Sequence, residues 1–353
     1  MSRFMNEKYA GLEAYTPGEQ PRDQQYIKLN TNESPFPPSP GVLSAVNAAE
    51  LEKLRLYCDP ACTELRAKLA ELYGVKPENV YLANGSDDIL NFAFMAFGGD
   101  GVVYPAISYG FYSVFAALHG VEAEEIPLEA DFGIDAEKYC GRNKLVVIAN
   151  PNAPTGLSIS LDDVERLLQR NPNHVVLIDE AYVDFGGESC LPLLKRYDNL
   201  LVVQTFSKSR SLAGARLGFA FGSEAVIADL EKIKYSTNPY NVNRLTQIAG
   251  IAALEQDEYY KENCRRIMEN RRYTADALKA LGFTVLDSKA NFVFAKSERI
   301  DGEALYLELK RRGVLVRHFS REEICQFNRI TIGSREEMER FIETVSEILE
   351  EIA

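Results

Sequence analysis

The sequence predicts an α/β protein with a large domain on a mostly parallel sheet and a smaller C-terminal α/β domain. Apolar segments at 144–149, 174–179 and 200–206 have the length and composition of strands that are buried on both faces. Segments with helical spacing of apolar residues alternate with these strands, which is typical of a parallel sheet. A length of 353 residues favours a large domain with a smaller one attached to it.

The chain divides into an arm and two domains. Residues 28–41 are rich in proline, which excludes a helix or an inner strand, so we expect an ordered arm packed on the small domain or a partner subunit. Tyr26, Ile27, Leu29 and Phe36 give this arm apolar side chains to dock with. The predicted boundaries are 1–41 for the arm, 42–245 for the large domain and 246–353 for the small domain.

The large domain begins with helical patterns at 42–56 and before Gly74, followed by a strand at 80–83. Asn84 and Gly85 then form a turn, and Ser86 is predicted to cap a helix that runs to residue 97. A strand, a glycine turn and a helix N-terminus leave backbone N–H groups free to bind an anion. An ordinary capped helix explains the same residues, and Asp87 and Asp88 would oppose an anion that met their side chains.

Polar side chains follow the apolar strands. Asn152 lies in a loop with two prolines after 144–149, Asp179 and Tyr182 follow 174–178, and Lys208 follows 200–206. Ligands of parallel sheets bind at the carboxyl ends of strands, so these residues are predicted to converge there. A solvated loop cation is the alternative interpretation of Lys208. Aromatic residues at 104–112 are typical of a core, although one at a strand end could stack on a planar ligand.

The remaining chain is helical from 224 to about 281, with a break at 235–243. We then expect two strands, a helix, two more strands and a final helix, at 283–286, 291–295, 301–312, 314–316, 329–332 and 335–352.

Composition excludes several classes of function. The net charge of −13 disfavours nucleic acid or an anionic membrane as a partner. Three separated histidines and six cysteines without a CxxC pair disfavour a metal site, and the thiols fit the reducing cytoplasm. We see no secretory leader and no apolar stretch of membrane-spanning length. A cytoplasmic protein without metal is therefore expected.

A lysine, a buried acid, a tyrosine, an asparagine and an anion site together match the needs of pyridoxal phosphate. This cofactor forms an imine with a lysine, and an acid beside its ring nitrogen keeps that nitrogen protonated. Donors are needed at its phenolic oxygen and an anion site at its phosphate. Lys208 and Asp179 would meet the first two needs.

Eight motifs carry a resemblance to a known family. They run through nearly the whole chain: LNTNESPFPPSP (29–40), YCDP with ELR (57–66), NGSDD (84–88), YPAISYG (104–110), NPNAPTG (150–156), DEAYVDF (179–185), TFSKSRSLAGARLGF (205–219) and RITIG (329–333). Their order and spacing resemble the fold-type I pyridoxal-phosphate enzymes, and most closely the histidinol-phosphate aminotransferase group of the aspartate aminotransferase superfamily.

The resemblance implies a role for each matching residue. Lys208 would form the imine and transfer the proton at the substrate Cα, with Asp179 at the ring nitrogen and with Asn152 and Tyr182 at the phenolic oxygen. Tyr109 would stack on the ring, unless Tyr112 does. The phosphate would be held by Ser86, Asp87, Thr205, Ser207 and Arg216, and by Tyr57 across a homodimer interface. The substrate would meet Arg329, Arg317 and Asn32.

Three motifs depart from the family pattern. YCDP replaces YPDP, GSDD replaces GSDE, and residues 317–329 lack the expected glycine- and proline-bearing pattern. The third departure lies where the phosphate end of the substrate would bind, so it bears on substrate identity more than on reaction type.

The resemblance implies amino transfer from histidinol phosphate to 2-oxoglutarate in histidine biosynthesis, with ping-pong kinetics. A threonine-phosphate decarboxylase and an aromatic or broad-range amino-acid aminotransferase are the alternatives that keep the cofactor. A non-catalytic regulatory module is disfavoured because too few residues precede the arm for a DNA-binding domain. A nicotinamide-dependent oxidoreductase is disfavoured because no GxGxxG follows a strand.

Overall fold

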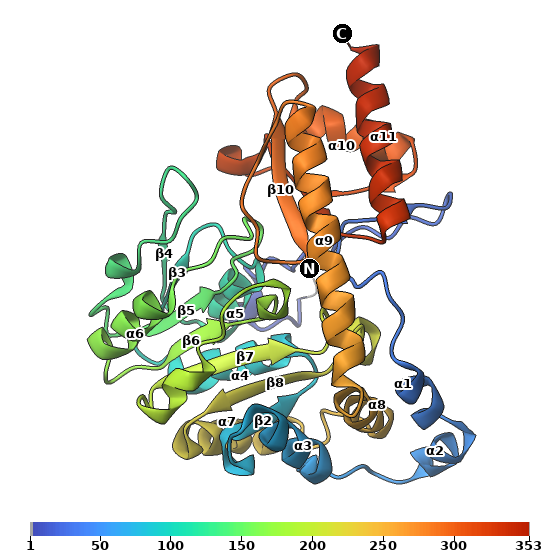
Figure 1. The fold of residues 1–353 in the computed structure, drawn as a ribbon. Coiled ribbons are helices and arrows are strands. Elements are labelled where there is room, and N and C mark those ends of the chain that lie inside the picture. The colour runs from blue at the N-terminus through green and yellow to red at the C-terminus, as the bar shows by residue number, and fades with distance from the viewer. Residues whose placement is uncertain (1–2, 353) are drawn as a thin grey trace.

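A seven-stranded sheet forms the centre of the larger unit in the computed structural model, which describes residues 3–352 (Figure 1). Its strand order is β2-β8-β7-β6-β5-β3-β4, and β8 runs antiparallel to both neighbours while the other pairs are parallel. The mostly parallel sheet expected from the sequence is therefore confirmed. The strands are β2 (Val80–Ala83), β3 (Val102–Pro105), β4 (Ala123–Ile126), β5 (Leu145–Ala149), β6 (Val176–Asp179), β7 (Leu200–Thr205) and β8 (Gly218–Gly222).

Helices cover both faces of this sheet, which explains why its inner strands are apolar throughout. In β5, Val146 and Ile148 join one core cluster while Leu145 and Val147 join the other. The first face carries α3 (Thr63–Tyr73), α6 (Leu161–Arg170) and α8 (Arg244–Leu254), and the second carries α4 (Ser86–Phe97), α5 (Phe111–His119) and α7 (Glu224–Thr237). This arrangement brings the carboxyl ends of β5, β6 and β7 to one edge.

A four-stranded antiparallel sheet, in the order β12-β13-β10-β9, forms the smaller unit. It shares a core with the long helix α9, with the final helix and with Leu29 of the arm. Its elements are α9 (Asp257–Ala280), β9 (Phe283–Val285), β10 (Phe292–Ser297), α10 (Gly302–Arg311), β12 (Arg317–His318), β13 (Asn328–Thr331) and α11 (Arg335–Glu351).

The arm and α9 connect the two units. The arm strand β1 (Ile27–Lys28) pairs in parallel with β11 (Val314–Leu315) of the smaller unit. Helix α9 has 24 residues and is therefore roughly 36 Å long; it rises from α8 into the smaller unit (Figure 1). The boundary predicted after residue 245 falls inside α8, whose apolar residues pack in the large core. We propose the turn before α9 as the boundary instead.

Two local predictions differ from the structure. The helix expected at 42–56 is divided into α1 (Pro40–Ala45), α2 (Ala48–Glu52) and a short 3-10 turn (Lys53–Arg55), because the Asn47 side chain accepts from the N–H groups of Ala49 and Glu50 and starts a second helix. Ser86 is not the N-cap of α4; Gly85 occupies that position with a φ of +85°.

Candidate active site

A cavity of about 320 Å³ lies at the carboxyl ends of β5, β6 and β7. It brings together residues that are more than a hundred positions apart in the sequence. The predicted site residues that line it are Ser86, Asp87, Tyr109, Asp179, Tyr182, Thr205, Ser207, Lys208 and Arg216. Of the four residues expected to converge at this edge of the sheet, Asp179, Tyr182 and Lys208 line the cavity and Asn152 does not.

Lys208 lies three residues beyond the end of β7 and extends into the cavity. Its Nζ donates to the carbonyl oxygen of Thr31 in the arm at 3.4 Å, a long hydrogen bond. The same Nζ is 5.8 Å from the centre of the Tyr182 ring. The amine is thus held by one weak contact beside an open space, which suits a nucleophile more than a structural cation.

Asp179 ends β6 as a buried carboxylate that is 5% exposed. Its Oδ2 accepts from the Tyr112 hydroxyl at 2.9 Å and its Oδ1 accepts from the N–H of Ala181 at 3.2 Å. Burial raises the pKa of Asp179 to about 6, against the lowering effect of these two donors and of Lys208. A carboxylate in this state would be stabilised by a cation in the cavity.

The N-terminus of α4 and Arg216 form the opposite end of the cavity. Arg216 Nη2 pairs with Asp87 Oδ2 at 2.9 Å. Gly85 has a φ of +85°, which favours glycine, and a Cβ there would come within 2.6 Å of the same Nη2 and force the arginine to shift. The Asp87 side chain therefore faces Arg216, while the Thr205 hydroxyl donates to that of Ser207 at 3.0 Å. Because a guanidinium has five N–H donors, Arg216 keeps donors for an anion.

Tyr109 lines the cavity and Tyr112 does not. The Tyr109 hydroxyl donates to Asp87 Oδ1 at 2.7 Å, and burial, followed by the charge of Asp87, raises the pKa of Tyr109. Tyr112 is fully buried against Tyr109 at a ring distance of 5.8 Å, and its hydroxyl serves Asp179. This geometry favours Tyr109 over Tyr112 as the aromatic face for a planar ligand.

Asn152 is buried beneath the cavity. Its Oδ1 accepts from the Ser108 hydroxyl at 2.7 Å and its Nδ2 donates to the carbonyl oxygen of Ile107 at 3.0 Å. Asn152 thus holds the segment after β3 that carries Tyr109; its contact with a cofactor stays a prediction.

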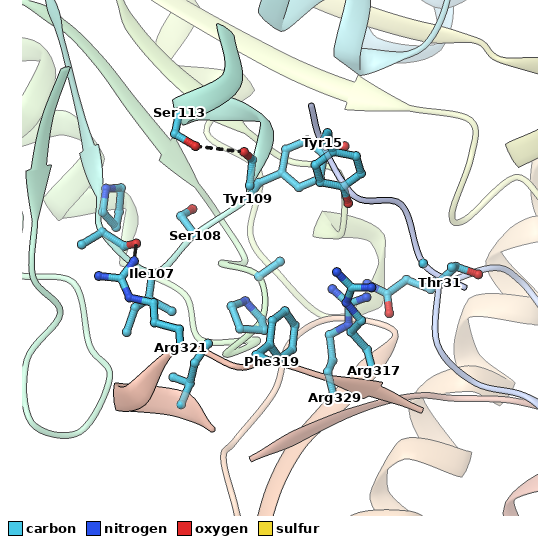
Figure 2. A pocket seen from close by; sticks show the side chains of 18 of the residues that line it. Tyr15, Thr31, Ile107, Ser108, Tyr109, Ser113, Arg317, Phe319, Arg321 and Arg329 are labelled. Carbon is cyan, nitrogen blue, oxygen red and sulfur yellow. Dashed lines mark hydrogen bonds between the residues drawn. The ribbon is translucent and has the colours of Figure 1, made fainter. Parts of the chain in front are cut away.

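A second cavity, of about 450 Å³, adjoins the first and shares Tyr109, Tyr182 and Lys208 with it. Figure 2 shows Arg317 and Arg329 side by side here, with Phe319 next to them. The two arginines are register partners in the β12–β13 pair, which places them on one face. Arg329 Nη2 donates to the carbonyl oxygen of Asn30 at 3.0 Å, and its buried Nε has no partner among residues 3–352.

Positively charged side chains predominate among the charged residues that line this second cavity. Burial, and then the neighbouring charge of Arg317, lowers the pKa of Arg329, although Tyr182 acts against this. Arg321 contributes a third arginine to the lining, beside Lys208, and Glu125 is a carboxylate there. An orphaned guanidinium N–H beside a second arginine suits a phosphate or carboxylate of a substrate.

Two other predicted site residues, Asn32 and Tyr57, have different surroundings from the two arginines. Asn32 lines the second cavity, but its amide Nδ2 donates to the Tyr182 hydroxyl at 2.9 Å. Tyr57 is 81% exposed and stacks on Tyr240 at a ring distance of 4.5 Å. It is therefore a surface residue of this chain.

The residues present fit pyridoxal phosphate. The Asp179 carboxylate, which forms no salt bridge within residues 3–352, suits a protonated ring nitrogen. The amine of Lys208 suits the imine carbon, and the start of α4 with Arg216 suits the phosphate. Across residues 3–352, no three histidine, cysteine, aspartate or glutamate side chains are grouped as a metal site would require. In the same part of the chain, every helix is too short or too polar to span a bilayer.

The fold and this site define a pyridoxal-phosphate enzyme of the fold-type I architecture. Residues 24–345 match the family model described as aminotransferase class I and II. The chain is 50% identical over 352 residues to the histidinol-phosphate aminotransferase of Brachyspira hyodysenteriae, covering 99% of each chain. The corresponding enzyme of Clostridium acetobutylicum is 46% identical over 351 residues, covering 99% of this chain and 100% of that one.

A solved structure agrees with these relatives. The histidinol-phosphate aminotransferase of Sinorhizobium meliloti in complex with pyridoxal-5'-phosphate superposes with a TM-score of 0.85 and 26% identity, covering 94% of this chain and 93% of that one. The chain belongs to the class I and II aminotransferases, and it is a pyridoxal-phosphate-dependent aminotransferase.

The structure adds site residues that sequence reasoning did not assign. Tyr15 of the arm stacks on Phe111 at 4.1 Å and lines the second cavity, as do Phe319 and Arg321 (Figure 2). Tyr112 is the hydroxyl donor to Asp179. The cluster of aromatic residues at 104–112 was a usable signal for Tyr112. Tyr15 carried no such signal, because only the folded arm brings it to the cavity.

Proposed function

We propose that this enzyme transfers the amino group of histidinol phosphate to 2-oxoglutarate, giving imidazole acetol phosphate and glutamate in histidine biosynthesis. The observation that carries the proposal is the full-length match to relatives of that name at up to 50% identity. The paired arginines beside Lys208 support it, because they provide the charge that a substrate phosphate needs.

The chain's residues divide the work at the cofactor end. When bound, pyridoxal phosphate withdraws electrons from the substrate Cα and so makes its proton acidic. Lys208 Nζ takes that proton and returns it as a general base and acid. Asp179 would keep negative charge beside the ring nitrogen, Tyr182 and Asn152 would donate to the ring oxygen, and Tyr109 would stack on the ring. The phosphate would be held by Thr205, Ser207, Arg216 and the N–H groups of Ser86 and Asp87.

Substrate anions are bound at the other end by Arg329 and Arg317. The chain has a net charge of −13, so its overall field repels anions and these two local cations have to overcome it. Glutamate, histidinol phosphate and the 2-oxo acid take turns in one site, which gives ping-pong kinetics.

A homodimer completes the site in this proposal. Tyr57 is 81% exposed, and the neighbouring Leu51, Leu54 and Leu56 are at least half exposed, so this segment offers a second copy an apolar surface. In the dimer, Tyr57 of one copy reaches the cofactor phosphate of the other. All six cysteines are free, which supports a cytoplasmic enzyme, and the acidic chain suits neither nucleic acid nor a membrane as a partner.

A half-reaction tests the proposed substrate. The cofactor-loaded protein is mixed with histidinol phosphate without any acceptor while its visible spectrum is recorded. We expect the absorbance of the lysine-bound cofactor to disappear and to return on addition of 2-oxoglutarate. Conversion by tyrosine or phenylalanine but not by histidinol phosphate would indicate the broad-range aminotransferase. Release of carbon dioxide from threonine phosphate would indicate the decarboxylase.

A further inference from the structure

Asn32 is a buried residue of the arm whose hydrogen bonds connect the smaller unit with Tyr182. It is 1% exposed and has a φ of +56°, a left-handed backbone conformation that asparagine adopts more readily than most residues other than glycine. Its carbonyl oxygen accepts from Asn291 Nδ2 at 3.0 Å, and its N–H donates to Thr331 Oγ1 at 2.9 Å. Its side chain bonds both Thr331 and Tyr182. Every polar group of Asn32 is therefore engaged.

The backbone N–H of Asn32 can only donate a hydrogen bond, and this fixes the direction of the bonds around it. The N–H of Asn32 donates to Thr331 Oγ1, so the Thr331 hydroxyl hydrogen is left for another acceptor. That acceptor is Asn32 Oδ1, 3.0 Å away. With the amide reversed, the hydroxyl of Thr331, a residue 2% exposed, would face an NH₂ group and lose its acceptor. The amide is held with Nδ2 toward Tyr182.

The same reasoning extends to the cavity. Asn32 Nδ2 donates to the Tyr182 hydroxyl oxygen at 2.9 Å, so the hydroxyl hydrogen of Tyr182 is free to point elsewhere. Tyr182 lines both cavities together with Lys208. We propose that Asn32 and Thr331 are positioning residues that direct the Tyr182 hydroxyl hydrogen into the cavity, where it meets an acceptor. This inference rests on the proposed function, because the acceptor is the ring oxygen of the cofactor.

This chain of bonds also joins the two units. Thr331 ends β13 of the smaller unit, and Thr31, which precedes Asn32, supplies the carbonyl oxygen that Lys208 contacts. A shift of β13 would thus change both the direction of the Tyr182 donor and the resting contact of the lysine. The titratable and charged groups that act on Tyr182 or Lys208 from the surrounding elements are Glu33, Asp179, Tyr109, Tyr112 and Arg329.

A pH titration of the cofactor-loaded protein tests the proposal without measuring turnover. A donor to the ring oxygen stabilises its negative charge and so favours loss of the proton from the lysine-bound nitrogen. Withdrawing that donor raises the pH midpoint of the visible absorbance change. We expect Tyr182→Phe to raise the midpoint by about one pH unit or more, and Thr331→Val by a smaller amount, because the freed amide then accepts from Tyr182 part of the time.

Two matched variants separate a change in packing from the effect of the hydrogen bonds that run from Thr331 through Asn32 to Tyr182, which we call the relay. Thr331→Ser keeps the hydroxyl, so its midpoint should stay with the wild type. Thr331→Val combined with Tyr182→Phe should match Tyr182→Phe alone, since the relay acts only through Tyr182. Asn32→Asp, whose side chain tolerates the positive φ, reverses the bond to Tyr182 and serves if the valine variant does not fold.

The outcomes are distinct. A midpoint that rises in Thr331→Val or Asn32→Asp, but not in Thr331→Ser or on top of Tyr182→Phe, supports the relay. Unchanged midpoints in both Thr331→Val and Asn32→Asp, or equal shifts with and without the Tyr182 hydroxyl, overturn it while the proposed function stands. A wild type without any lysine-dependent visible band overturns both.

Discussion

The two cavities are built from different kinds of segment. The first cavity, which we call the cofactor cavity, is formed mainly by residues that follow β5, β6 and β7 or begin α4. The three strands are neighbours in the large sheet, and α4 packs on it. The second cavity, which we call the substrate cavity, is lined by Tyr15 of the arm, by residues from 104–113 and by residues from 317–329 of the smaller unit (Figure 2). The first is built mainly on one sheet, while the second depends on three segments that are distant in the sequence.

This difference separates chemistry from specificity. Residues at the strand ends are anchored in the buried sheet, so we expect the groups proposed for proton transfer to keep the same geometry with different substrates. Arg317 and Arg329 lie on short strands of the smaller unit, where we expect a change of side chain to act more on the substrate than on the cofactor. Substitutions at the two ends should therefore have separable effects.

The largest effect is expected from Lys208→Ala. Removing the amine removes both the covalent link to the cofactor and the general base, so turnover should fall by about 10,000-fold or more. Absorbance spectra should lose the lysine-dependent band while circular dichroism stays unchanged. A retained band would place the cofactor on another residue.

Asp179→Asn should reduce turnover by about 100- to 1,000-fold, because a neutral amide no longer stabilises positive charge at the ring nitrogen. Cofactor should still bind through the phosphate end. Stopped-flow half-reactions measure the loss in a single turnover, and a near-normal rate would show that the ring nitrogen lies elsewhere.

The same substitution should stabilise the cofactor-free protein. The pKa of Asp179 is raised from 3.8 to about 6, so its protonated form stabilises the fold below pH 4 and this contribution is lost as the pH rises through 6. At pH 8, cofactor-free Asp179→Asn should exceed the wild type by up to about 3 kcal/mol in unfolding free energy. Urea denaturation at pH 4 and pH 8 measures the difference in unfolding free energy between the variant and the wild type, which should be smaller at pH 4. A wild type that is more stable than the variant at pH 8 would contradict this prediction.

Arg329→Lys should act at the substrate end alone. A lysine cannot reproduce the forked donors of arginine, so kcat/KM for histidinol phosphate should fall by about 10- to 100-fold. The absorbance spectrum of the resting enzyme and its pH midpoint should stay as in the wild type. A changed resting spectrum would mean that the two ends are coupled through Arg329.

The smallest effect is expected from Tyr112→Phe. Loss of its hydrogen bond to Asp179 should lower the unfolding free energy by about 1 kcal/mol and reduce turnover several-fold. The pKa of Asp179 in the cofactor-free protein should rise further, which the pH dependence of stability measures. An unchanged pH dependence would show that the Tyr112 hydroxyl does not act on Asp179.

The same contrast explains what the sequence could predict. Lys208, Asp179 and the NGSDD turn stand directly after apolar strands, so local patterns placed them at one edge of the sheet. Tyr15, Arg321 and the engagement of Asn32 depend on tertiary contacts between segments that no local pattern relates. The two wrong predictions of helix starts have a local cause. Gly85 rather than Ser86 is the N-cap of α4, and Asn47 is the N-cap of a second helix within 42–56.

Phosphate discrimination tests the division between the two ends most directly. Half-reaction rates with histidinol phosphate and with histidinol, which lacks the phosphate, are compared in the wild type and in Arg329→Lys. We expect the wild type to prefer the phosphorylated substrate by about 100-fold or more, and the variant to lose most of that preference while converting histidinol at the wild-type rate. Equal preference in the two proteins would contradict the assignment of specificity to the arginine pair.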